Sequence, residues 1–159
     1  MTAPPPPARA RKPVAFLAHS FTDADRFVVT KIRGVLRAGG WSVSTGSTAA
    51  ALSVSEKVRA RIDAADLFVA LMTHRHRIGA ESWTASPWVI EEKAYSLGSD
   101  ARRPIVVLLE QGIPTPEETG GLNGDLEYIR FDRHRLDAAL RSLREVLRSV
   151  AMVCSRTSD

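Results

Sequence analysis

The chain contains a single cysteine, Cys154, among its 159 residues. This scarcity excludes a disulfide framework within the chain and a metal site built from cysteine. The sequence also lacks an apolar run of the roughly 18–20 residues that cross a bilayer. Residues 1–13 carry basic side chains but no apolar stretch behind them, so they do not resemble a secretory signal. These absences predict a cytoplasmic protein with no membrane partner.

The glycine motifs that bind phosphates are missing too. The sequence has no GxGxxG after a candidate strand and no GxxxxGK[ST]. A phosphate-accepting receiver domain needs an aspartate at the end of its third strand, where this sequence has Met72 and Thr73. His74 and His76 alternate with arginines, and no cysteine or carboxylate stands at ligand spacing from them. We therefore predict no metal site and interpret this segment as a basic loop.

Charge and aromatic content argue against nucleic acid as a partner. The net charge is only +4 and aromatic residues make up 6% of the chain, whereas nucleic-acid binding needs a concentrated basic stripe with interleaved aromatics. Arg141, Arg144 and Arg148 share one face of a predicted helix. That face is interpreted either as a solvated surface or as a contact for an anionic partner.

The length and the 44% hydrophobic content suit one domain with one well-filled core. Residues 1–13 include four consecutive prolines and are predicted to be a disordered Pro- and Arg-rich tail. A single domain is predicted over residues 14–153, and a second disordered tail over residues 154–159.

Five short stretches, most of them continuously apolar, are typical of parallel strands buried on both faces. They are Val14–Ala18, Trp41–Thr45, Leu67–Met72, Pro104–Leu109 and Leu126–Phe131.

Helical segments alternate with these strands. The first is predicted to follow an N-cap at Thr22 or Asp23, to bury a stripe that includes Phe27, and to stop at Gly39-Gly40. The others are predicted from about Val54 to Ala64, from Ser86-Pro87 to about Leu97 with an end at Gly98, and from Leu136 to Val150. A long exposed loop, 74–85, precedes the third helix.

This alternation predicts an α/β fold of the flavodoxin-like kind, a three-layer sandwich. Right-handed crossovers imply a five-stranded parallel sheet, ordered 2-1-3-4-5, with helices on both faces. Such sheets bind ligands beyond the carboxyl ends of their strands, where the strand order reverses. The predicted site therefore borders the segments that follow Ala18, Thr45 and Met72. The first of these, residues 19–23, is hydroxyl-bearing and leads into a helix, so we interpret it either as an anion-binding loop or as a simple helix cap.

Three segments, in order and spacing, resemble the Toll/interleukin-1 receptor-like (TIR) domain. Residues 16–20 (FLAHS), with Asp23 three positions later, are similar to the first box of that family. Residues 53–68 are similar to the helix after its BB loop. Residues 86–92 (SPWVIEE) match its Ser-x-Trp-x-x-x-Glu pattern, and the resemblance spans Val14 to Leu147.

The resemblance implies two kinds of function. Some TIR domains are adaptors that associate with themselves or with other TIR domains. Others, including many bacterial ones, cleave NAD into nicotinamide and ADP-ribose or a cyclic form, and would use NAD as a substrate with no further cofactor. The family pattern makes Glu92 the catalytic residue. The expected substrate-binding residues are His19, Ser20, Phe21, Ser86 and Trp88.

One carboxylate is enough for this chemistry, because nicotinamide leaves a cationic pyridinium as a neutral molecule and needs no general acid. Helical periodicity alone assigns the buried face of this helix to Ile90, Ala94 and Leu97, which makes Glu92 a solvated residue nearly opposite. Glu91 is the adjacent alternative. A non-catalytic interaction module and a relative of the nucleoside deoxyribosyltransferases remain the other interpretations of the chain.

Overall fold

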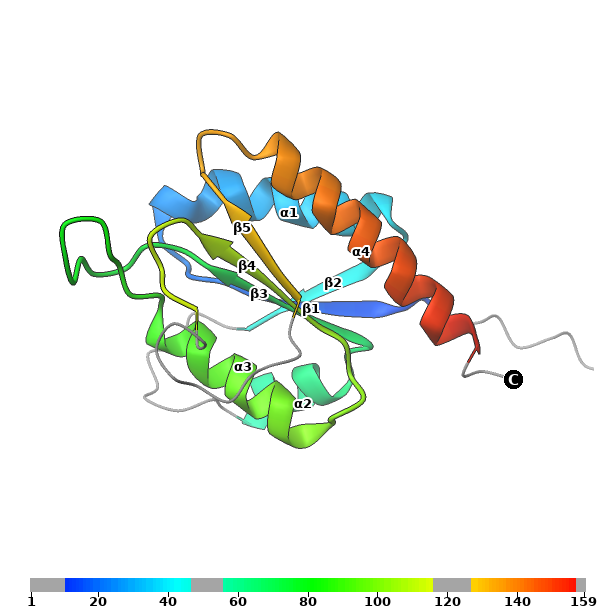
Figure 1. Ribbon diagram of the computed structural model, residues 1–159. Helices are drawn as coiled ribbons and strands as arrows, with labels where there is room; N and C mark the ends of the chain where they lie inside the picture. The colour runs from blue at the N-terminus through cyan, green and yellow to red at the C-terminus, as the bar shows by residue number, and fades with distance from the viewer. Residues whose placement is uncertain (1–10, 47–55, 116–126, 157–159) are drawn as a thin grey trace, which may run out of the picture.

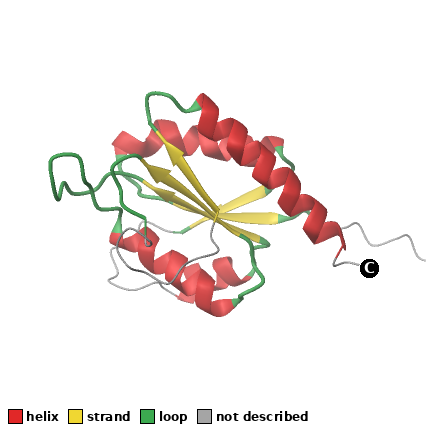
Figure 2. Ribbon diagram, in the orientation of Figure 1, coloured by secondary structure: helices red, strands yellow, loops and turns green. Residues whose placement is uncertain are grey.

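A computed structural model of the protein describes residues 11–46, 56–115 and 127–156. Within these ranges one sheet lies between two layers of helices (Figures 1 and 2). The strands are β1 (Val14–Ala18), β2 (Ser42–Thr45), β3 (Leu67–Met72), β4 (Ile105–Glu110) and β5 (Glu127–Phe131). The helices are the short 3-10 helix η1 (Asp23–Asp25), α1 (Arg26–Ala38), α2 (Glu56–Asp63), α3 (Pro87–Ser99) and α4 (Asp137–Arg156).

The sheet has the predicted topology. All its strand pairs are parallel and the order is β2-β1-β3-β4-β5, which confirms the flavodoxin-like fold. Leu17 of β1 pairs with Thr45 of β2 on one side and with Val69 of β3 on the other. The strand order therefore reverses at β1, and the carboxyl ends of β1, β2 and β3 lie together.

Alternating side chains of the sheet fill two cores. Leu17 and Val69 belong to the core under α1 and α4, and Phe16 and Phe68 belong to the core over α2 and α3. Figure 1 shows the same two pairs of helices on opposite sides of the sheet. The rings of Phe16 and Phe68 stack with centroids 5.6 Å apart, which ties β1 to β3 on the side of α3.

The start of the first helix differs from the prediction. A 3-10 turn, η1, precedes α1, and the Thr22 side chain makes no capping hydrogen bond there. Phe27, expected in the core, is 60% exposed, and the Lys31 ammonium lies 5.3 Å from the centre of its ring. The prediction for Phe27 was wrong because the inward positions of α1 are 28, 29, 32, 35 and 36, which leave position 27 on the outside.

The largest correction concerns α3. Its buried residues are Val89, Glu92, Lys93 and Ser96, whereas Ile90 is 46% exposed and Ala94 is exposed. The helix also continues through Gly98 to Ser99. Polar side chains occupy the inner face partly because buried Arg103 donates a hydrogen bond to the Ser96 hydroxyl, over 3.2 Å, and another to the Ala65 carbonyl.

The segment predicted as a long loop forms a short hairpin. Arg77 and Trp83 pair in an antiparallel bridge, and the Arg75 amide donates to the Thr84 carbonyl over 2.7 Å. The hairpin residues 75–82 are exposed, as expected, and project beyond the carboxyl ends of the strands (Figure 1).

The ends of the predicted domain carry further contacts. Arg11 pairs with Asp66 over 2.7 Å, and the Pro13 carbonyl accepts a hydrogen bond from the Ser42 amide. Residues 154–156 of the second predicted tail belong to α4. The rest of the predicted tails, residues 1–10 and 157–159, and Val54 of the second predicted helix lie outside the described residues. Among the helices that the structure describes, none combines the length and the apolar character needed to cross a membrane.

Candidate functional site

Three elements meet where the strand order reverses. Residues 19–21 follow β1, and Gly46 follows β2. Helix α3 packs against β1 and β3, so its first turns lie beside the same edge. This is the place where parallel α/β sheets bind ligands.

The sequence around Ser86 positions α3. Ser86 has an extended backbone with φ −61° and ψ 125°, Pro87 occupies the first helical position, and the Ser86 carbonyl accepts a hydrogen bond from the Ile90 amide. The Ser86 hydroxyl makes no capping hydrogen bond. Trp88 therefore lies in the first turn and Glu92 one turn later on the same side of the helix.

Glu92 is enclosed. Only 1% of this residue is exposed, and its Oε1 atom has no hydrogen-bond partner among the described residues. The Nε1 atom of Trp88 is likewise buried without a partner in that part of the chain. Both atoms lie against Gly46, where a Cβ would come within 2.6 Å of Glu92 Oε1 and 3.6 Å of Trp88 Nε1. The missing side chain at position 46 thus leaves the space that the carboxyl group occupies.

Burial raises the pKa of Glu92 to about 7. The nearby indole N–H of Trp88 limits the rise, although its geometry falls short of a regular hydrogen bond. A carboxyl group with this pKa is populated in both its ionised and its protonated form near neutral pH, which suits it for charge stabilisation or for proton transfer.

The neighbouring glutamate has a different environment. Glu91 is exposed, whereas Glu92 faces the sheet edge. The interpretation of Glu92 as a solvated residue was wrong, because the helix turns its polar residues 92, 93 and 96 inward. Of the two carboxyl groups, that of Glu92 is the one that lies buried against Gly46 at the sheet edge.

His19 and its neighbours form the edge after β1. His19 is 6% exposed, and its Nδ1 atom lies 2.8 Å from the Ser20 carbonyl. Because a carbonyl only accepts, Nδ1 carries the proton and Nε2 is the acceptor; Nε2 is buried with no partner in the described ranges. Burial and the charge of Arg33 lower the pKa of His19, and the hydrogen bond with Ser20 and the charge of Asp25 oppose this. The lowered pKa favours the neutral ring at pH 7. The half-exposed ring of Phe21 packs on the His19 ring, and the two ring centroids are 4.5 Å apart.

The structure brings only part of the predicted site together. Trp88 and Glu92 meet at Gly46, a residue that sequence reasoning missed because a single glycine after a strand carries little signal. His19 interacts instead with charges on η1 and α1, namely Asp25 and Arg33. The contacts described for His19 and for Glu92 do not join the two groups.

Four strand-end segments are linked by an ion network next to this edge. Arg133 donates two hydrogen bonds to Glu110, over 2.5 and 2.7 Å, and one to Asp25 over 3.2 Å. Asp25 also accepts from the Thr73 hydroxyl over 2.6 Å, and Glu110 accepts from the His74 amide over 2.8 Å. The network fixes η1 relative to the ends of β3, β4 and β5.

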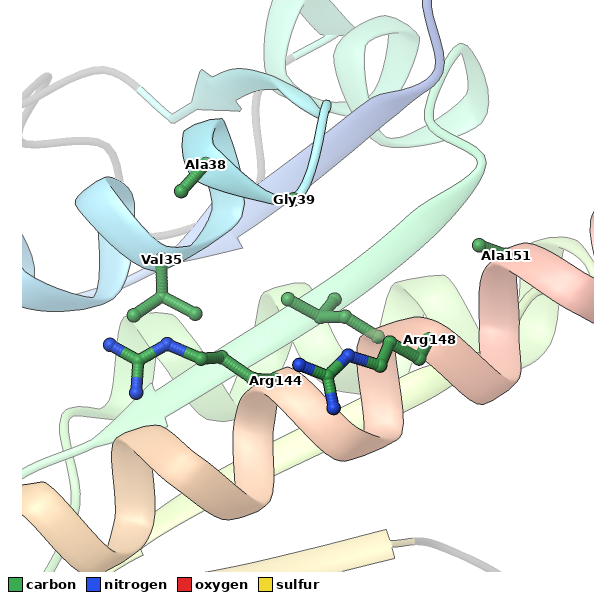
Figure 3. A pocket seen from close by; sticks show the side chains of 7 residues that line it. Val35, Ala38, Gly39, Arg144, Arg148 and Ala151 are labelled. Carbon is green, nitrogen blue, oxygen red and sulfur yellow. The ribbon is translucent and has the colours of Figure 1, made fainter.

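The predicted arginine face lies elsewhere. Arg144 and Arg148 line a cavity of about 230 Å³ between α4 and the end of α1, with Val35 and Leu147 as apolar neighbours (Figure 3). Helix α1 begins at the carboxyl ends of the strands and ends at their amino ends, where β2 begins. This cavity is therefore at the opposite end of the sheet from Glu92. The cavity adds no group to the site. The described residues contain no group of three or more His, Cys, Asp or Glu side chains that could hold a metal ion.

Comparison with known proteins identifies the fold alone. No protein-family model and no curated protein matches the sequence. A flavodoxin-like domain from Synechococcus matches with a TM-score of 0.53 and 14% identity, over 90% of this chain and 99% of that one. A CMP N-glycosidase from Clostridium botulinum matches with a TM-score of 0.51 and 18% identity, over 82% and 97% of the two chains. A response regulator receiver protein from Sinorhizobium medicae gives a TM-score of 0.48 at 14% identity, over 86% and 97%. The chain is a flavodoxin-like α/β protein.

Proposed function

We propose that this chain is a TIR-like enzyme that cleaves the nicotinamide–ribose bond of NAD, as a glycohydrolase or an ADP-ribosyl cyclase. The observation that carries the proposal is the Glu92 carboxyl group, which is buried at the strand-order reversal with one oxygen unpartnered among the described residues. The order of the TIR-like segments supports the choice of NAD. The fold likeness to a CMP N-glycosidase is compatible with chemistry at an N-glycosidic bond.

In the proposed reaction the bond between ribose C1′ and the pyridinium nitrogen breaks, and its electron pair neutralises the leaving nicotinamide. The ionised Glu92 stabilises the positive charge that develops on the ribose. Water then adds to C1′ and loses a proton, which gives ADP-ribose; an internal nucleophile on the adenine ring gives the cyclic form instead. His19, Ser20, Phe21, Ser86 and Trp88 are the proposed substrate contacts. Because Glu92 is only 1% exposed, the backbone around Gly46 has to move away before a ribose can reach it.

The test is release of free nicotinamide from NAD by the purified chain, measured by chromatography over a range of protein concentrations. We expect Glu92→Gln to lower the rate about 100-fold or more, as removal of one preorganised charge does in other enzymes. Glu91→Gln is the matched control, since it removes an exposed carboxyl one residue away, and it should keep the wild-type rate. Equal rates for wild type and Glu92→Gln would refute the assignment.

The pKa of about 7 at Glu92 supports a second candidate, a nucleotide N-glycosidase or deoxyribosyltransferase-like enzyme with a neutral base as leaving group. A neutral base needs a proton, which a protonated Glu92 would donate. The two candidates differ in pH dependence. Cleavage of NAD should increase as Glu92 ionises and level off above about pH 7, whereas cleavage of CMP should decrease over the same range.

An enzyme of this kind would act in the cytoplasm, in signalling or defence, and would associate with itself or with another TIR-like protein. If neither NAD nor a nucleotide is cleaved at any protein concentration, while the chain forms oligomers that are unchanged in Glu92→Gln, the chain is a non-catalytic interaction module.

A further inference from the structure

A cavity of about 380 Å³ opens beside α3; Lys93 is among the residues that line it, and neither Trp88 nor Glu92 is. Met72 and Leu109, at the ends of β3 and β4, line it together with Ile90, Ala94 and Leu97 of α3. These three helix residues are the apolar stripe that the sequence assigns to the core. Since Ala94 and Glu92 are about 160° apart around the helix axis, the cavity is separate from the proposed catalytic site.

The walls of this cavity carry an unusual exposure of apolar side chains. Ile90 on α3 is 46% exposed and Ile78 on the hairpin is 61% exposed, and both line the cavity. They are two of the five large apolar residues that the structure describes as exposed. Exposed apolar groups gathered around one concave, mainly apolar cavity are typical of a binding site.

The hairpin wall is held in place. The Trp83 amide donates to the Gly112 carbonyl over 2.8 Å, and the Trp83 ring stacks on His74 with centroids 4.6 Å apart. Gly112 has φ +91°, and a Cβ there would lie 2.9 Å from the Glu81 carbonyl oxygen, so the approach of the hairpin requires glycine. The cavity is therefore preformed rather than created by the ligand.

The volume of the cavity suits a small molecule better than a protein segment. Small-molecule pockets have volumes of roughly 300–1,000 Å³, and the cavity is at the lower end of that range. One turn of helix, about 10 Å across and 5.4 Å long, already fills roughly 400 Å³. A docking helix would therefore insert only one or two side chains.

The aromatic side chains of Trp83 and Tyr128 and the thioether of Met72 line the cavity, and a thioether makes favourable contacts with aromatic rings.

We infer that this cavity binds a small, mainly apolar molecule with an aromatic ring, and that the site is independent of Glu92. The probe for the test is N-phenyl-1-naphthylamine, an uncharged aromatic amine that fluoresces in apolar surroundings. We expect saturable binding of one probe molecule per chain and a melting temperature that rises with probe concentration. Glu92→Gln should bind the probe as the wild type does, so the outcome of this test does not depend on the proposed activity.

The decisive variant is Ala94→Phe, which fills the cavity from an exposed helix position. It should weaken probe binding about tenfold or more and abolish the probe-dependent rise in melting temperature. Ala138→Phe, at an exposed position of α4, is the matched control and should bind as the wild type does. Equal probe affinity in the two variants, or no saturable binding to the wild type, would overturn the inference. So would self-association of the wild type that Ala94→Phe abolishes, because a second copy would then cover the cavity.

Discussion

Glu92 carries the proposed chemistry, and its burial makes stability depend on pH. The pKa of Glu92 is raised from its ordinary value of 4.5 to about 7 in the folded chain. Between these values the folded state keeps a proton that the unfolded state has lost, so the free energy of unfolding falls as the pH rises. Above about pH 7 the loss is complete and amounts to about 3 kcal/mol. The folded protein keeps an ionisable group at the sheet edge at a cost to its own stability.

Glu92→Gln should remove this dependence. The amide has nearly the same shape and does not titrate, so the stability of the variant relative to the wild type should increase by about 3 kcal/mol between pH 4.5 and pH 8. Urea unfolding at a series of pH values measures the difference. A constant difference over that range would mean that the carboxyl group is not buried in solution. The same measurement shows whether any loss of activity in this variant comes from unfolding.

Gly46 should matter more for activity than for stability. In Gly46→Ala the new Cβ would lie 2.6 Å from Glu92 Oε1, which is the end of a flexible side chain and can move away at little cost. We expect a stability loss below about 1 kcal/mol and a fall in kcat/KM for NAD of about 10- to 100-fold, because the carboxyl group is displaced. Gly34→Ala is the control: a Cβ at this exposed α1 position meets nothing within 4 Å, so activity should be unchanged. Parallel rate and melting measurements separate the two effects, and unchanged kcat/KM in Gly46→Ala would contradict the role of this contact.

At the scale of the element, α3 buries polar side chains and exposes Ile90, and substitutions at two neighbouring positions test this orientation of the helix. Val89 is 0% exposed, so Val89→Ala should lower the free energy of unfolding by about 2 kcal/mol. Ile90→Ala removes more apolar atoms but from a 46% exposed side chain, and should change stability by about 0.5 kcal/mol or less. Denaturant unfolding of both variants decides the orientation, and a larger loss for Ile90→Ala would show that the helix is rotated in solution.

The same helix shows what sequence patterns can predict. Strands β1 and β3 are continuous apolar runs and β4 is one up to Glu110, and their bounds were predicted to within a residue because such runs have few other uses in a small α/β domain. In α3 the apolar stripe of Ile90, Ala94 and Leu97 lines an open cavity, while Glu92 lies inside. Periodicity assumes that apolar residues face the core, so it misplaces a helix whose inner face is polar. Functional sites are where that assumption fails most often.

The candidate site was predictable only in part, because some of its contacts leave no pattern in the sequence. The segment-by-segment resemblance, not the periodicity, selected Glu92 and Trp88. Gly46 contributes by having no side chain, and a single glycine after a strand carries little signal in one sequence. The tautomer of His19 depends on a 2.8 Å contact with the Ser20 carbonyl, which requires coordinates.

At the scale of the whole molecule, the ion network holds the carboxyl edge of the sheet together. Asp25 and Glu110 are 3% and 2% exposed, and Arg133 is the cation between them. Burial alone would raise the pKa of Glu110, but hydrogen bonds from Arg133 and from the His74 amide outweigh it and lower the pKa below its ordinary value. The paired state of Glu110 therefore stabilises the fold at neutral pH, and this contribution is lost as the pH falls through the lowered pKa.

Arg133→Gln should destabilise the whole fold, because it leaves two buried carboxylates without their cation. We expect a loss of about 3 kcal/mol at pH 7 in urea unfolding. The loss should shrink on acidification, since a protonated Glu110 no longer needs the guanidinium. Arg135→Gln removes an exposed arginine two residues away and should change stability by about 0.5 kcal/mol or less at every pH. A pH-independent loss in Arg133→Gln would mean that packing, and not charge, holds these strand ends.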